Sequence, residues 1–334
     1  MTSATHILLC GALLLGGSIP AHAAPQESFL EARAGAGLLK ATLVTPASPP
    51  TSTVLIVPGS GPTDRDGNNP LGVKASTYRL LAEGLAAHGV ATLRIDKRGM
   101  FASATAATDA NAVTIPDYVA DVDAWVAVLR KQTGAPCVWV LGHSEGGLVA
   151  LAAARNSHVC GVILVSAAGR PMGEVVRQQL KANPANEPLL DQALPAIDAL
   201  EAGKKVDTSG MPAPLLRLFN PQVQGFLISV FSYDPAQLIA GYTKPVLILQ
   251  GLRDIQVREA DAQLLKKADP AATLVLLPDV NHVLKSVTSD DVRANVATYG
   301  NSSLPLAPGV IEPIADFLST HAEKDGQNPN RIKH

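Results

Sequence analysis

The sequence predicts an α/β fold in which a mostly parallel sheet carries helices on both faces. Short apolar segments rich in β-branched residues alternate along the chain with segments that have helical periodicity. Connections of this kind join parallel strands, and a parallel sheet is covered on both of its faces. The 334 residues and a 47% hydrophobic composition suffice for one large domain of this class with an insertion.

The alternation can be followed element by element. After an extended lead-in, strands are predicted at residues 37–46, 53–57, 90–95, 138–141, 161–166, 245–251 and 272–277. Helices are predicted at residues 78–88, 117–132, 148–155 and 309–321, each with apolar residues on one face. A polar, glycine-rich loop, 58–69, is too long and too charged to be a simple turn.

The strand and helix rhythm stops between residues 170 and 242. This segment contains helical patches at 174–181 and 189–201, several prolines and apolar clusters. Because it lies between two predicted core strands, we interpret it as an inserted, mainly helical cap. The predicted core is then residues 24–169 together with 243–321, and residues 322–334 form a polar tail.

The first 23 residues resemble a secretory signal peptide. They contain no Lys, Arg, Asp or Glu, carry an apolar run from Ile7 to Gly17, and end in Ala21-His22-Ala23, which fits a small-residue cleavage site. The usual basic residue near the start is missing. The apolar run is too short for a membrane span, and no later segment approaches one, so we expect a periplasmic or secreted protein.

Charge and cysteine content limit the function classes. A formal net charge of −2 with no basic block argues against a nucleic-acid partner. Cleavage would leave two cysteines, Cys137 and Cys160, each next to a predicted strand. They could form a disulfide in an oxidising compartment or remain two buried thiols, and the sequence does not separate these alternatives. Two cysteines without a histidine pair do not make a thiolate zinc site.

A strand, a tight turn and a helix follow one another at residues 138–154. The turn carries Gly142-His143-Ser144-Glu145-Gly146, the G-x-S-x-G pattern of a nucleophile elbow. Glycines are required because the two backbones approach closely, and the serine at the apex takes a strained conformation. The hydroxyl of Ser144 is thereby presented beyond the end of the sheet, next to unpaired N–H groups of the helix.

Two further polar residues follow predicted strand ends. Asp254 comes after strand 245–251 and His282 after strand 272–277, so the order along the chain is Ser144, Asp254, His282. His282 is selected because the other mature histidines lie at helix ends, at the wrong end of the sheet or in the tail, and His143 cannot turn back onto Ser144. Asp279 is the competing acid, but its proximity to His282 suits a turn former better.

This order, the elbow, the Pro58-Gly59-Ser60-Gly61 loop and the cap together resemble the α/β-hydrolase superfamily. The segments 59–67 and 96–99 resemble its bacterial branch of esterases and serine aminopeptidase-like hydrolases. The resemblance implies a catalytic triad of Ser144, Asp254 and His282. It also implies an oxyanion hole from the N–H groups of Glu145 and Ser60.

One departure from the family pattern concerns the oxyanion loop. Pro58 stands where related enzymes carry a histidine, which leaves Gly59 and Gly61 as alternative donors. The charged residues of the two flanking loops have two interpretations, substrate binding or a salt-bridged scaffold, and the second is the commoner. These residues are Asp64, Arg65, Asp66, Asp96 and Arg98.

The predicted function is hydrolysis of carboxylic esters through an acyl-enzyme, with no metal or organic cofactor. We expect a small-molecule ester substrate whose acyl or alcohol part fits an apolar pocket formed by the cap. A peptidase or amidase and a thioesterase with the same triad are alternatives, and a catalytically silent binding protein is a further one.

Overall fold

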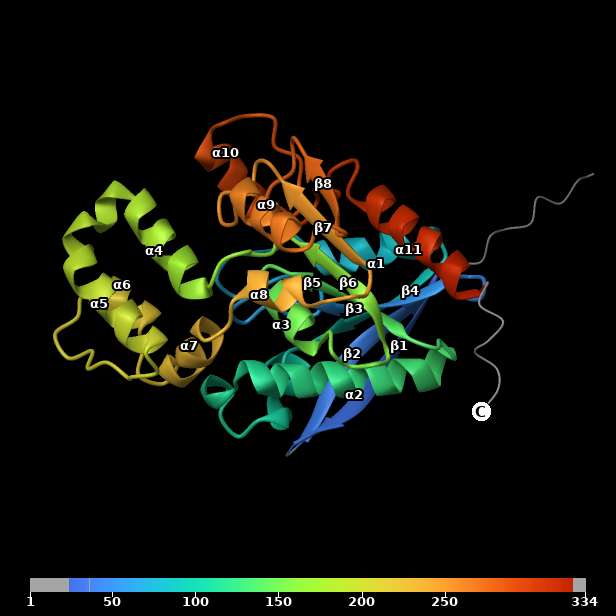
Figure 1. The fold of residues 1–334 in the computed structure, drawn as a ribbon, viewed down its shortest axis with the longest axis horizontal. Helices are drawn as coiled ribbons and strands as arrows, with labels where there is room; N and C mark the ends of the chain where they lie inside the picture. Colours follow the sequence, from blue (N-terminus) through green and yellow to red (C-terminus); the bar gives the residue numbers. More distant parts are fainter. Residues whose placement is uncertain (1–23, 36, 327–334) are drawn as a thin grey trace, which may run out of the picture.

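The computed structural model describes residues 24–35 and 37–326 (Figure 1). The predicted signal peptide and the last part of the predicted tail, 327–334, lie outside the described residues. Figure 1 shows a central twisted sheet between two layers of helices, with a separate group of helices to one side.

Eight strands form one sheet in the order β1-β2-β4-β3-β5-β6-β7-β8. Their bounds are β1 Gln26–Ala34, β2 Gly37–Thr45, β3 Ser52–Val57, β4 Val90–Ile95, β5 Val138–His143, β6 Val159–Val165, β7 Val246–Gly251 and β8 Thr273–Leu277. The pairs β1–β2 and β2–β4 are antiparallel, and every pair from β4 to β8 is parallel. The predicted fold class, a mostly parallel sheet with helices on both faces, is therefore confirmed.

Helices cover the two faces through their apolar sides. On one face lie α1 (Thr77–Ala87) and α11 (Ile311–Gly326), and on the other lie α2 (Ile115–Thr133), α3 (Glu145–Ala153) and α9 (Glu259–Ala268). In α2 the fully buried Trp125 and Leu129 share one face, as residues four apart do on a helix. The central strands β3, β4 and β5 are buried along their whole length, which explains their continuous apolar sequences.

The segment between β6 and β7 is helical. It contains α4 (Met172–Ala182), η3 (Pro184–Leu189), α5 (Leu190–Glu201), α6 (Ala213–Leu218), α7 (Gln224–Phe231) and α8 (Pro235–Ala240). Helices α4 to α7 form the group at the left of Figure 1, whereas α8 packs against α3 and α9 of the core. The limits of a cap domain remain a prediction.

The sequence did not predict every element. It missed α9 and the short α10 (Val292–Ala297), and α11 continues to Gly326, through the start of the predicted tail. Helix α3 begins at Glu145 rather than Leu148 because the elbow passes directly into it. Gly146 and Gly147 hid that first turn, since glycine has a poor helix propensity.

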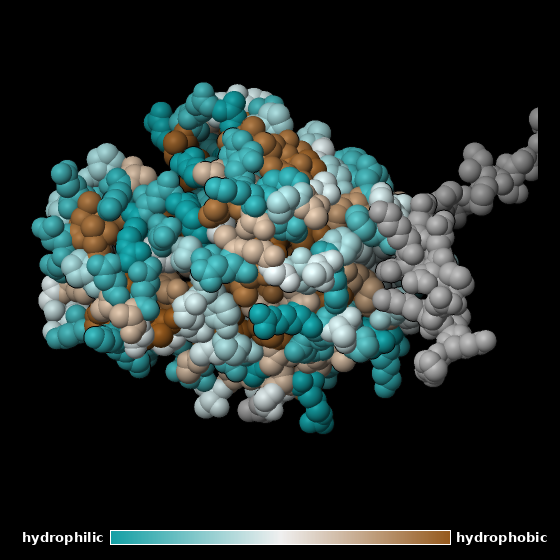
Figure 2. All heavy atoms as spheres, viewed as in Figure 1, coloured by the Kyte–Doolittle hydropathy of each residue, from teal (hydrophilic) through white to brown (hydrophobic). Residues whose placement is uncertain are grey.

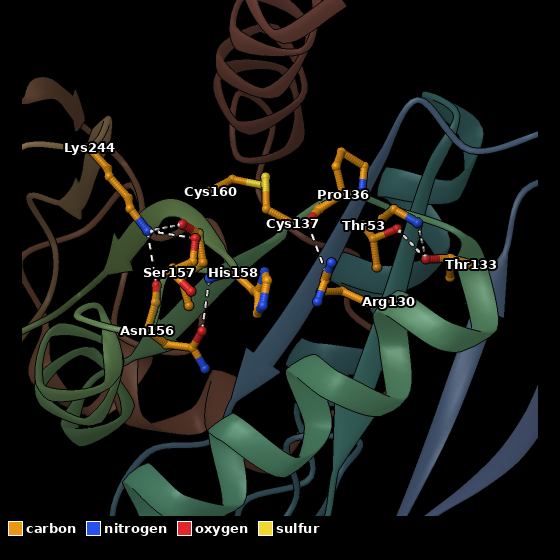
Figure 3. The surroundings of a disulfide bond; sticks show 12 residues. Thr53, Arg130, Thr133, Pro136, Cys137, Asn156, Ser157, His158, Cys160 and Lys244 are labelled. Atoms are coloured by element: carbon orange, nitrogen blue, oxygen red, sulfur yellow. Dashed lines mark hydrogen bonds between the residues drawn. A yellow bond between two sulfur atoms is a disulfide. The ribbon is translucent and has the colours of Figure 1, made fainter. Parts of the chain in front are cut away.

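Cys137 and Cys160 form a disulfide with a Cα–Cα distance of 5.2 Å (Figure 3). It joins the beginnings of the neighbouring parallel strands β5 and β6, at the opposite end of β5 from Ser144. Of the two alternatives that the sequence left open, the structure has the disulfide. Nearby, Arg130 Nε donates to the carbonyl oxygen of Pro136 at 2.9 Å and ties the end of α2 to this region.

Hydrophilic residues cover most of the molecular face in Figure 2, with hydrophobic residues in separate patches. Within the described residues, no helix has both the length and the apolar character that crossing a membrane requires.

Candidate active site

Ser144 occupies a strained turn between β5 and α3. Its backbone has φ 55° and ψ −123°, a combination that costs energy for a residue with a side chain. The flanking glycines make the turn possible: a Cβ on Gly142 would lie 2.1 Å from the Gly146 carbonyl oxygen, and one on Gly146 would lie 2.3 Å from the Val57 carbonyl oxygen. Ser144 itself is half-buried and lines a cavity.

Asp254 and His282 meet in the loops that follow β7 and β8. His282 Nδ1 lies 2.7 Å from Asp254 Oδ2, although the two residues are far apart in the sequence. The other carboxylate oxygen, Oδ1, accepts the backbone N–H groups of Gln256 at 2.8 Å and Val257 at 2.9 Å. The Asp254 side chain is fully buried and that of His282 is 7% exposed.

Asp254 is held as a carboxylate by these contacts. Burial alone would raise the pKa of Asp254, but the neighbouring His282 and the two backbone N–H donors bring that pKa below its usual value. The competing acid, Asp279, has a side chain 53% exposed and lies 3.9 Å from Arg253 Nε. The structure therefore places Asp254, not Asp279, against the histidine.

Ser144, His143 and His282 line one open cavity. Its other walls are the 59–77 loop region and residues from the C-terminal part of the fold, namely Gly59, Ser60, Thr63, Gly67, Asn69, Val73, Thr77, Tyr78, Gln256, Val283 and Tyr299. All of these lie outside residues 170–242. The expectation that the cap forms an apolar pocket at the nucleophile is therefore wrong for this cavity, because the loop after β3 and the segment around Tyr299 enclose it instead.

The predicted oxyanion donors lie on two sides of the nucleophile. Glu145 is the first residue of α3, and Ser60 is exposed in the cavity. A Cβ on Gly59 would lie 3.2 Å from Ser144 Cβ, so the peptide that joins Gly59 to Ser60 passes directly beside the serine. The N–H of Gly59 donates to Tyr78 Oη at 2.9 Å, which commits it elsewhere and favours Ser60 over Gly59.

A chain of buried hydrogen bonds links this loop to the histidine. Tyr78 Oη lies 2.9 Å from His143 Nδ1, and His143 Nε2 lies 2.8 Å from the carbonyl oxygen of His282. A carbonyl only accepts, so His143 Nε2 carries the hydrogen and His143 Nδ1 accepts from Tyr78. Burial lowers the pKa of His143 to about 3, which agrees with a neutral ring in this chain.

A family model described as "Alpha/beta hydrolase family" matches residues 54–296, which include the elbow and the loops that carry Asp254 and His282. The chain belongs to the alpha/beta hydrolase family. The predicted membership of this superfamily is therefore confirmed.

Individual relatives agree with this assignment. Esterase EstD of Thermotoga maritima is 28% identical over 268 residues, which are 78% of this chain and 61% of EstD. The chain thus spans less than two thirds of the length of that relative.

Two solved structures share the fold of this hydrolase. GrgF from Penicillium sp. sh18 matches with a TM-score of 0.58 and 18% identity, covering 89% of this chain and 99% of GrgF. Est1E from Butyrivibrio proteoclasticus matches with a TM-score of 0.54 and 17% identity, covering 88% and 99%. At these identities the likeness concerns the fold alone.

In this alpha/beta hydrolase the charged loop residues pair with one another. Arg65 Nη2 lies 2.6 Å from Asp96 Oδ2, and Arg98 Nε lies 3.1 Å from Asp121 Oδ2. Asp66 pairs with Arg94, and Asp64 Oδ1 accepts the N–H groups of Asp66 and Asn68, both at 2.8 Å. The scaffold interpretation of this cluster is the one that these contacts support.

Sequence reasoning missed three residues that touch the site. From the sequence alone, Tyr78 is only the start of a helix, His143 is excluded as the partner of Ser144, and Lys97 belongs to the 96–99 segment without a role of its own. Lys97 is 5% exposed, and its Nζ donates to the carbonyl oxygen of Gly59 at 2.7 Å. The one signal in the sequence was the position of Lys97 two residues after a buried strand, at the edge where the reactive groups gather.

No group of three or more His, Cys, Asp or Glu side chains that could hold a metal ion occurs in the part of the chain that the structure describes.

Proposed function

We propose that this hydrolase is a serine enzyme that cleaves carboxylic esters through an acyl-enzyme intermediate. The observation that carries the proposal is the hydrogen-bonded pair of His282 and Asp254 beside the same cavity as the strained Ser144. The name of one relative, Esterase EstD, supports an ester as substrate.

The contacts define how each group would act. Donation from His282 Nδ1 to Asp254 leaves His282 Nε2 free to take the proton of the Ser144 hydroxyl. The serine oxygen then attacks the ester carbonyl, and the N–H groups of Ser60 and Glu145 stabilise the oxyanion. The alcohol leaves with the proton from His282, and water hydrolyses the acyl-enzyme by the same steps.

The test uses purified protein, short p-nitrophenyl esters and a fluorophosphonate probe. We expect Ser144→Ala to abolish both labelling and turnover while the thermal unfolding temperature is retained. Ser157→Ala is the matched control, because Ser157 is exposed in the loop before β6, and it should keep both activities. Undiminished turnover by Ser144→Ala would refute the assignment.

The alternatives give different results in the same assays. A peptidase or amidase would hydrolyse aminoacyl anilides faster than esters, and a thioesterase would prefer acyl thioesters. A silent binding protein would fold normally yet take up no fluorophosphonate. A series of esters of graded acyl length, assayed beside Ser144→Ala, would define the preferred substrate.

We also propose that the protein is exported to the periplasm or secreted. The segment 1–23 with its Ala21-His22-Ala23 end supports this, and the Cys137–Cys160 disulfide suits an oxidising compartment. N-terminal sequencing of the protein recovered from the expressing cells tests it: a chain that begins at residue 24 is expected, and a retained segment in the cytoplasm would contradict the proposal.

A further inference from the structure

The buried side chain of Lys97 binds the peptide unit that carries a predicted oxyanion donor, the Ser60 N–H. Lys97 Nζ lies 2.7 Å from the Gly59 carbonyl oxygen but 3.7 Å from Glu145 Oε1, so its closer partner is the carbonyl. The side chains of Lys97 and Glu145 are 4% and 5% exposed. Removing these two charges from water costs free energy, so the buried pair need not stabilise the fold. Its position therefore suggests a second role.

The geometry of a peptide supplies that reason. The carbonyl of Gly59 and the N–H of Ser60 belong to one planar trans unit, in which they point in opposite directions. The carbonyl points inward to the buried Lys97, so the Ser60 N–H points outward, into the cavity beside Ser144. A cation on the carbonyl also polarises the unit and strengthens the N–H as a donor.

The counter-ion of Lys97 stands at the other donor. Glu145 follows Ser144, and its own N–H is the second predicted oxyanion donor. Burial lowers the pKa of Lys97 and raises that of Glu145, while their mutual attraction opposes both shifts. Because Lys97 contacts both the Gly59 carbonyl oxygen and the Glu145 side chain, it connects the two sides of the predicted oxyanion hole. The centre of the Tyr118 ring lies 5.5 Å from the Lys97 ammonium.

We propose that Lys97 is a positioning residue for the oxyanion hole: held by Glu145, it fixes the Gly59 carbonyl so that the Ser60 N–H faces Ser144. This rests on the proposed function, because an oxyanion arises only in acyl transfer. Lys97 itself does not touch the reacting atoms. Its effect should fall on the transition state and leave substrate binding nearly unchanged.

The kinetic test compares Lys97→Met with wild type on a p-nitrophenyl ester. Loss of one oxyanion donor costs about 100-fold or more in kcat, so we expect that fall in kcat with little change in KM. Lys97→Met also leaves Glu145 as an unpaired buried acid, so Lys97→Met/Glu145→Gln is made in parallel. We expect the double variant to regain thermal stability but not kcat.

A neighbouring ion pair gives the matched control. Arg98, from the same loop as Lys97, forms a buried pair with Asp121 of α2 and makes no contact with Gly59. Arg98→Met/Asp121→Asn should therefore leave kcat of the folded protein unchanged. If Lys97→Met keeps full kcat, or if the double variant with Glu145→Gln restores it, Lys97 only neutralises a buried carboxylate and the proposal is overturned.

A second readout does not depend on turnover. In protein labelled with ¹⁵N at serine only, the Ser60 amide signal is identified by its loss in Ser60→Ala. We expect Lys97→Met to shift this signal and to speed its exchange with solvent, whereas Arg98→Met/Asp121→Asn should not. An unmoved Ser60 signal refutes the positioning role. If wild type hydrolyses no ester, thioester or anilide, the proposed function fails while this measurement still decides the role of Lys97.

Discussion

Replacing Tyr78 with phenylalanine removes a hydroxyl group that satisfies two buried partners at once. The hydroxyl oxygen accepts the N–H of Gly59 at 2.9 Å, and the hydroxyl donates its hydrogen to His143 Nδ1, also at 2.9 Å. Tyr78 is 2% exposed, so water cannot readily replace the hydroxyl. Burial accordingly raises the pKa of Tyr78 above its ordinary range, and the group stays a neutral phenol.

The magnitude follows from the count of orphaned groups. Each buried donor or acceptor left without a partner costs about 1–3 kcal/mol, so Tyr78→Phe should destabilise the protein by about 2–6 kcal/mol. Since about 1 kcal/mol corresponds to roughly 1.6 °C in a domain of this size, the unfolding temperature should fall by at least about 3 °C. The same series of hydrogen bonds runs through His143 to the carbonyl oxygen of His282 and helps to position that histidine. Loss of the Tyr78 hydroxyl should therefore lower kcat as well.

Tyr242→Phe is the control, measured by the same thermal scans. The hydroxyl of Tyr242 is also buried but has no hydrogen-bond partner among the described residues, so its removal should be neutral or stabilising. Equal stability of Tyr78→Phe and wild type would refute the hydrogen-bond chain. Equal losses in the two variants would show that removal of a buried hydroxyl sets the cost, whether or not the hydroxyl is hydrogen-bonded.

Three further predictions concern the scaffold of the site. Cys137→Ser/Cys160→Ser opens a loop with a sequence separation of 23 residues and should cost about 3 kcal/mol in denaturant unfolding, with kcat unchanged because the bridge lies at the far end of β5. Since burial lowers the pKa of His143 to about 3, the unfolded chain binds a proton below pH 6.5 that the folded one does not, and stability should fall by up to about 1.4 kcal/mol for each pH unit on acidification from pH 6.5. His143→Gln, whose amide can donate and accept in the same places, should flatten that part of the stability curve, and an unchanged slope would contradict the neutral ring. Gly142→Ala should prevent folding, because its Cβ would lie 2.1 Å from a backbone oxygen, whereas Gly225→Ala in α7 has open space and should fold; a soluble, active Gly142→Ala would refute the packing of the elbow.

The sequence by itself determined the sheet, the elbow and the order of the polar residues. Continuous apolar runs such as 53–57 specify strands buried on both faces, and the glycines around Ser144 specify a turn that only small residues allow. These are local properties of period, size and backbone freedom. Asp254 and His282 were found because each follows a strand whose carboxyl end lies at a known edge of the sheet.

Only the tertiary structure decided how those residues are held. The disulfide, the contact of Tyr78 with His143 and the grip of Lys97 on Gly59 each join residues that are distant in sequence, so no local pattern encodes them. The walls of the cavity were likewise decided by which loops fold over the sheet edge, and not by the apolar character of the cap. Pairings of this kind depend on packing between elements, and a lysine in the loop after a strand has the same local sequence whether its side chain ends in solvent or beneath an active site.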